Sequence, residues 1–189
     1  MEEKLFDIWQ RRDGHFETWL EDKVIKVLTD YGVGASKLTS AKGKIFGGGY
    51  EIYIVAFFIG LYSDQKLELS GETKKFGQTI QYWGHLESRL GRKSYYKIVD
   101  YIFAALVAKC DIDFIALEKG EIEPSKVAND LINAMDQYAN YGFYQIYERL
   151  RQNTYYFARN SSFLDWIQEL VNPKNDNTNS DGNDDCDPL

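Results

Sequence analysis

Cations and aromatic rings are interleaved between Glu72 and Lys97, a combination that can bind nucleic acid. The segment holds six lysines and arginines against two glutamates, a net charge of +4. Positive side chains pair with phosphates, and rings stack on bases. The residues expected to contact nucleic acid are Lys74, Lys75, Tyr82, Trp83, Arg89, Arg92, Lys93 and Lys97. The alternative is that the rings pack in the core while the charges only solvate a surface.

The glycine cluster at positions 47–49 is a candidate anion site, because backbone N–H groups are unpaired where a helix begins. Nearby lysines would add positive charge. The residues expected at this site are Lys42, Lys44, Gly48 and Gly49. The segment lacks the G-x-x-x-x-G-K-[ST] and G-x-G-x-x-G patterns, so we do not predict a nucleotide-binding loop.

The sequence contains no pattern typical of a catalytic or metal centre, and we predict no catalytic residues, no metal and no cofactor. His15 and His85 are isolated from other metal-ligating residues, and we expect both on the surface, partly exposed. Asp111 and Asp113 could bind magnesium, but carboxylates at such positions more often lie at helix ends. A G-x-S-x-G motif of a serine hydrolase is also missing.

The helical spacing of apolar residues indicates that the elements that position these side chains are mostly helices. It predicts one helix from Phe16 to Tyr31, and another from Tyr95 to Cys110 with Ser94 as its N-cap. Pro124 opens a third helix, whose predicted buried face is Val127, Leu131, Ile132, Met135 and Tyr138. Gly142 is expected to end this helix, and further helices follow over 143–157 and after Ser161 or Ser162.

The stretch "YEIYIVAFFIGLY" at 50–62 follows the glycine cluster and is apolar on nearly every side. A helix that is hydrophobic all round is usually buried at the centre of a domain. Gly60 would let a neighbouring helix approach it closely. Alternating patterns are rare outside "LELSGE", so we predict an all-α, single-domain helical bundle around this central apolar helix.

Composition separates a folded region from a polar tail. We predict a helical domain at 1–172 and a disordered acidic tail at 173–189, where five aspartates and one lysine give a charge of −4. The N-terminal residues include acids where a signal peptide would carry positive charge. No apolar stretch reaches the ~18 residues that a bilayer span needs. We therefore expect a cytoplasmic protein without membrane association.

Two segments, "AFFIGLY" at 56–62 and "YANYGFYQI" at 138–146, resemble the small accessory proteins of bacterial DNA phosphorothioation (Dnd-type) systems. The matching positions are Ile59–Tyr62, at the end of the apolar helix, and Tyr138, Ala139, Asn140 and Gly142, in a "YANGG"-like segment. Tyr141 departs from that pattern, and Lys66 stands where the family has an arginine pair. The resemblance covers roughly residues 47–150. It implies a cytoplasmic prokaryotic protein linked to DNA modification or phage defence, without catalytic residues of its own.

The sequence thus favours a non-enzymatic helical accessory protein of a bacterial DNA modification or phage-defence system, which contacts DNA through the basic and aromatic segment. The alternative is a protein–protein interaction subunit, or a homo-oligomer, with a tyrosine-rich interface and no nucleic-acid contact. Fourteen tyrosines make such an interface plausible.

Overall fold

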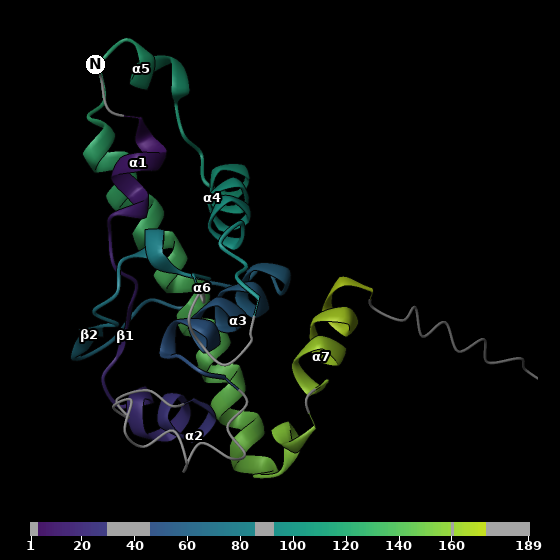
Figure 1. Ribbon diagram of the computed structural model, residues 1–189. Helices are drawn as coiled ribbons and strands as arrows, with labels where there is room; N and C mark the ends of the chain where they lie inside the picture. The colour runs from purple at the N-terminus through teal and green to yellow at the C-terminus, as the bar shows by residue number, and fades with distance from the viewer. Residues whose placement is uncertain (1–3, 30–45, 86–92, 160, 173–189) are drawn as a thin grey trace, which may run out of the picture.

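The computed structural model describes residues 4–29, 46–85, 93–159 and 161–172, and this part of the chain is mostly helical (Figure 1). The longer helices are α3 (Gly49–Tyr62), α4 (Ile98–Lys109), α6 (Pro124–Gln152) and α7 (Ser162–Val171). The shorter ones are α1 (Leu5–Gln10), η1 (Glu21–Ile25), α2 (Lys26–Leu28), η3 (Ile80–Tyr82), α5 (Phe114–Glu118) and η4 (Tyr156–Ala158). The described residues also form two strands, β1 (His15–Glu17) and β2 (Thr73–Lys75). The long helix α6 runs the length of the molecule, and α1, β1, η1, α3, α4 and η4 pack along it, whereas α7 packs against α3 and η4.

The contact between α3 and α6 forms the centre of the core. Eleven of the fourteen residues of α3 are buried, which confirms that the apolar segment is an enclosed helix. The glycines on both sides allow the helices to approach closely. A Cβ atom on Gly60 would lie 2.1 Å from the backbone oxygen of Tyr138, and one on Gly142 would lie 1.9 Å from that of Ala56. Because Ala56 faces Gly142 and Gly60 faces Tyr138, the two helices run antiparallel where they meet.

Helix α6 begins at Pro124 as predicted, since proline suits the first position of a helix. The predicted buried face is also confirmed: Val127, Leu131, Ile132, Met135 and Tyr138 are all buried. The prediction that Gly142 ends the helix is wrong. The helix continues to Gln152, because the close contact with α3 supplies packing energy that exceeds the helix-propensity cost of one glycine, about 1 kcal/mol.

The predicted helix from Phe16 to Tyr31 is wrong at its start and is confirmed only over 21–28. The chain instead forms β1, then the π-helical turn η1 and the short helix α2. The strand forms here because the side chain of Asp136 accepts a hydrogen bond from the backbone N–H of His15, and the ring of Phe16 packs on that of Phe76, 4.5 Å between centroids. Tertiary contacts thus override the helical spacing of the apolar residues.

A two-stranded antiparallel sheet is the part of the fold that the all-α prediction lacks. Strand β1 pairs with β2 in a register that places His15 opposite Lys75 and Glu17 opposite Thr73. Strand β2 directly follows the alternating "LELSGE" segment rather than lying within it. All three residues of β2 are exposed, so the strand carries no apolar alternation that the sequence could reveal.

Helix α4 begins three residues later than predicted, with Lys97 rather than Ser94 at the N-cap position. Ser94 and Tyr95 instead continue an irregular segment that enters the helix. The expected role of Asp113 is confirmed: its carboxylate accepts a hydrogen bond of 2.9 Å from the backbone N–H of Ala116 and so caps α5. The predicted acidic tail at 173–189 lies outside the described residues. Within the described ranges, no helix combines the length and the apolar character needed to cross a bilayer.

Candidate nucleic-acid interface

The entry to α4 is fixed by a close contact between Gly84 and Tyr95. Gly84 has a φ of +78°, which favours glycine, and a Cβ atom there would lie 2.8 Å from the backbone of Tyr95. The backbone N–H of Tyr95 donates to the carbonyl of Gly84 at 2.8 Å. This contact brings the rings of His85 and Tyr96 together, with centroids 5.5 Å apart and planes 28° from parallel. The backbone that carries the rings of His85 and Tyr96 therefore has a defined conformation.

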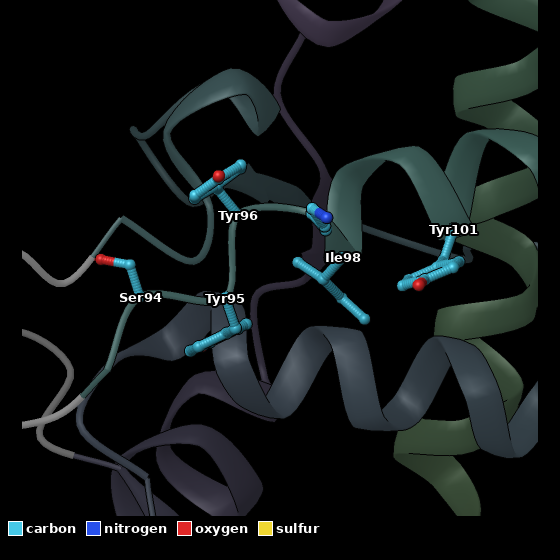
Figure 2. A pocket seen from close by; sticks show the side chains of 6 residues that line it. Ser94, Tyr95, Tyr96, Ile98 and Tyr101 are labelled. Atoms are coloured by element: carbon cyan, nitrogen blue, oxygen red, sulfur yellow. The ribbon is translucent and has the colours of Figure 1, made fainter.

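A surface pocket of about 330 Å³ lies at this entry (Figure 2). We call it the α4 entry pocket, and its lining residues are Ser94, Tyr95, Tyr96, Lys97, Ile98 and Tyr101. Figure 2 shows the side chain of Ile98 between those of Tyr95 and Tyr101. The outer rings are available to a ligand, because Tyr96 is 51% exposed and Tyr101 is 64% exposed. The pocket thus combines two exposed rings, an apolar side chain and a cation.

Tyr95 anchors the pocket to the N-terminus of α3. Its hydroxyl donates to Oε1 of Glu51 at 3.1 Å. The other oxygen of this carboxylate, Oε2, accepts from the backbone N–H of Gly47 at 2.9 Å. Burial and the neighbouring Glu51 carboxylate raise the pKa of Tyr95 above its ordinary value, so the hydroxyl remains protonated and acts as the donor. These hydrogen bonds tie the floor of the pocket to the start of α3.

Some of the residues predicted to bind nucleic acid lie at or beside this pocket. Lys97 lines it, and exposed Lys93 directly precedes Ser94 in the chain. Tyr82 is 55% exposed, and its backbone carbonyl accepts from the N–H of His85. Arg89 and Arg92 lie outside the described residues. The basic and aromatic segment therefore contributes part of its predicted set to this surface.

Trp83 is a correction to the predicted set. Its side chain is fully buried, its indole N–H donates to the carbonyl of Gln78, and its ring packs on those of Tyr50 and Tyr53. A ring enclosed on all sides cannot stack on a base. For Trp83 the alternative that the sequence left open, packing in the core, is the one observed.

Lys74 and Lys75 lie on β2, away from the pocket. In Figure 1, β2 lies to the left of α6 and α4 to its right. The ammonium group of Lys74 lies 2.5 Å from the carboxylate of Glu21, and that of Lys75 lies 3.9 Å from the carboxylate of Asp13. A phosphate at β2 would have to compete with these carboxylates. The structure thus separates cations that are close in sequence into two surfaces.

The predicted anion site at the start of α3 is described only in part. Gly48 occupies the N-cap position and Gly49 begins the helix, whereas Lys42 and Lys44 lie outside the described ranges. The carboxylate of Glu51 lies in the first turn and binds the N–H of Gly47. One amide that an anion could use therefore already has a partner with negative charge. The anion site stays a prediction.

A second polar cluster, centred on Asp136, could not be recognised from the sequence. Asp136 is 5% exposed and accepts from the backbone N–H of His15 at 2.9 Å, from its Nδ1 at 2.8 Å and from the hydroxyl of Tyr53 at 2.5 Å. The hydrogen bond to Asp136 raises the pKa of His15. Burial raises the pKa of Asp136, against the effect of these hydrogen bonds. His15 is partly exposed as predicted, but its partner lies 121 positions away.

A third cluster surrounds the carboxylate of Glu17, which is 1% exposed. Its Oε1 accepts from the backbone N–H and hydroxyl of Ser70 and from Nδ2 of Asn140. Its Oε2 accepts from the indole N–H of Trp19 and the hydroxyl of Tyr144. All of these donors belong to the protein itself. The cluster therefore ties β1 to α6 and to the segment before β2. Because both oxygens of Glu17 already accept hydrogen bonds from the protein, the carboxylate has little room to bind a ligand.

Metal binding gains no support from the described part of the chain, where no group of three or more His, Cys, Asp and Glu side chains is placed to hold an ion. Of the six residues that line the pocket, the predicted set contains only Lys97, and it omits the two exposed rings, Tyr96 and Tyr101. For Tyr101 the sequence contained a usable signal. This residue does not fall on the apolar face of its helix, so the spacing of its neighbours already turns its ring outward.

Comparison with known proteins does not extend this description. No protein family, curated protein or solved structure matches the chain.

Proposed function

We propose that this protein binds nucleic acid through the α4 entry pocket, together with the neighbouring lysine Lys93. The observation that supports the proposal is the pocket itself, in which exposed Tyr96 and Tyr101 and the cation of Lys97 line one concave surface. Aromatic rings that stack on bases, beside cations that pair with phosphates, are the usual means of sequence-tolerant binding. Lys74, Lys75 and Trp83 are not part of the proposed surface.

The test is a salt titration of binding to fluorescently labelled 20-nucleotide DNA, tested both as a single strand and as a duplex. The logarithm of the affinity should fall linearly with the logarithm of salt concentration, by about 0.7 to 0.9 for each phosphate contact. Lys97→Glu should weaken binding and reduce this slope by about 1. The fold should tolerate the change, because a carboxylate is favourable near the N-terminus of a helix.

Lys126→Glu is the matched control, because Lys126 is an exposed lysine in the first turn of another helix, α6. It should leave affinity and slope close to those of the unmodified protein. Absence of binding to both forms of DNA at low salt would contradict the proposed function. An equal loss in the two variants would instead indicate a general charge effect without a defined site.

We further propose that binding serves an accessory role, without enzymatic activity, in a bacterial DNA modification or phage-defence system in the cytoplasm. This role rests on the resemblance of the chain to Dnd-type accessory proteins. Several residues that carry the resemblance have structural roles here: Gly60 and Gly142 form the α3–α6 contact, and Asn140 binds Glu17. The division into one helical domain at 1–172 and a disordered tail at 173–189 belongs to the same proposal.

A tyrosine-rich protein interface is the second candidate function. The observation that favours it is the short helix α5, on which Phe114 is 48% exposed and Ile115 is 67% exposed, in addition to exposed Tyr101 on α4. Rings and aliphatic side chains of this kind are common at the centres of interfaces. Sedimentation velocity over a hundredfold range of protein concentration separates a self-associating chain from a monomer.

A further inference from the structure

We infer that the ligand of the α4 entry pocket is single-stranded nucleic acid rather than a duplex; this inference rests on the proposed function. In a duplex the faces of the bases are covered by their neighbours, and only base edges and phosphates are accessible. The exposed faces of Tyr96 and Tyr101 could add affinity only with bases that are unstacked. A pocket lined by two exposed rings therefore fits an unpaired strand.

The charge near the pocket leads to the same conclusion. Binding to duplex DNA through its backbone depends on lysines and arginines that neutralise phosphates. Among the described residues at the α4 entry, Lys93 and Lys97 are the cations, and Asp100 in the first turn of α4 opposes them. In this part of the surface, two lysines and one aspartate leave a net charge of +1, a small charge for holding a duplex by its backbone. At this part of the surface, stacking on the two rings must therefore supply a large share of the affinity.

Stacking can supply that share. Alanine substitutions at base-stacking rings cost about 1–3 kcal/mol for each base. Two rings would therefore contribute more than two exposed lysines, each of which loses much of its interaction to salt screening. His85 stacks on Tyr96 and limits the orientations of its ring, which lowers the entropy lost when a base binds. Ile98, between Tyr95 and Tyr101, gives the base an apolar contact.

The experiment compares a labelled 15-nucleotide oligothymidine with a 15-base-pair duplex by fluorescence anisotropy at 50 mM salt. The unmodified protein should bind the single strand at least tenfold more tightly. Tyr101→Leu keeps an apolar side chain but removes the ring, and it should weaken single-strand binding by about 5- to 150-fold, which corresponds to 1–3 kcal/mol. Tyr101→Phe keeps the ring and should change the affinity less than threefold.

Tyr155→Leu is the matched control, because Tyr155 is a tyrosine that is 81% exposed and lies outside the pocket. Its affinity should equal that of the unmodified protein. Equal binding of strand and duplex, or single-strand binding that Tyr101→Leu leaves unchanged, would overturn this inference and leave the proposed function standing. Failure to bind either probe would overturn both. Thermal melts by circular dichroism establish that each variant is folded.

Discussion

Replacing Gly142 with alanine is expected to destabilise the protein by about 3 kcal/mol or more. The added methyl group would lie 1.9 Å from the backbone oxygen of Ala56, and that oxygen cannot move without displacing α3. Gly60→Ala should have a similar effect, because its Cβ atom would meet the backbone of Tyr138 at 2.1 Å. Urea unfolding followed by circular dichroism should give a lower midpoint with an unchanged slope.

Asn133→Ala is the matched control for this prediction, since Asn133 is exposed on the same helix, α6. Alanine has the highest helix propensity, so this variant should be as stable as the unmodified protein or slightly more stable. If Gly142→Ala behaved in the same way, the two helices could not be packed backbone to backbone. The arrangement described here, with α3 and α6 in close antiparallel contact, would then be incorrect.

Glu17→Gln is expected to cost about 3 kcal/mol of folding free energy. The carboxylate accepts five hydrogen bonds from Ser70, Asn140, Trp19 and Tyr144 in a buried site. Glutamine replaces one acceptor oxygen with an NH₂ group that faces these donors, so that several buried donors lose their partner. Equilibrium unfolding at pH 7 measures the effect.

The effect of Glu17→Gln should depend on pH in a defined direction. Burial alone would raise the pKa of Glu17, but the hydrogen bonds from Ser70, Trp19, Asn140 and Tyr144 outweigh it and lower the pKa. The carboxylate therefore stabilises the fold above its ordinary pKa near 4.5, and this contribution is lost as the pH falls through the lower folded-state value. The difference between the two proteins should narrow on acidification.

Glu148→Gln is the control for the charge change, because Glu148 forms an exposed pair with Arg151. Exposed pairs contribute little, and this variant should lose less than about 1 kcal/mol. A Glu17→Gln variant as stable as Glu148→Gln would mean that water, rather than the protein, solvates the carboxylate of Glu17.

The sequence predicts well those elements whose signal is local. Helix α3 is apolar on every side and α6 has an amphipathic repeat after Pro124, so each could be recognised from its own residues. The role of Gly60 also followed from its position in an apolar helix. Gly142 was misread because a glycine that ends a helix and a glycine that admits a neighbouring helix are identical in sequence, and only the contact with Ala56 distinguishes them.

Long-range pairing explains the parts that could not be predicted. Strand β1 is held by β2 and by Asp136, which lie about 60 and 120 positions away, and nothing in the local residues indicates them. For the candidate site, the segment at 72–97 includes Lys97, which lines the α4 entry pocket, and Lys93, which precedes it in the chain. It could not reveal that Trp83 faces inward or that β2 carries Lys74 and Lys75 to another surface, because side-chain direction depends on the tertiary fold.

The binding surface is tested most directly by nuclear magnetic resonance of the ¹⁵N-labelled protein during titration with oligothymidine. The largest changes in amide chemical shift should fall between Lys93 and Tyr101, with smaller ones at His85. The amides of β1 and β2 should remain unchanged. Changes centred on Lys74 and Lys75, or a spectrum that does not respond at oligonucleotide concentrations that saturate anisotropy, would contradict the assignment of the α4 entry pocket as the binding site.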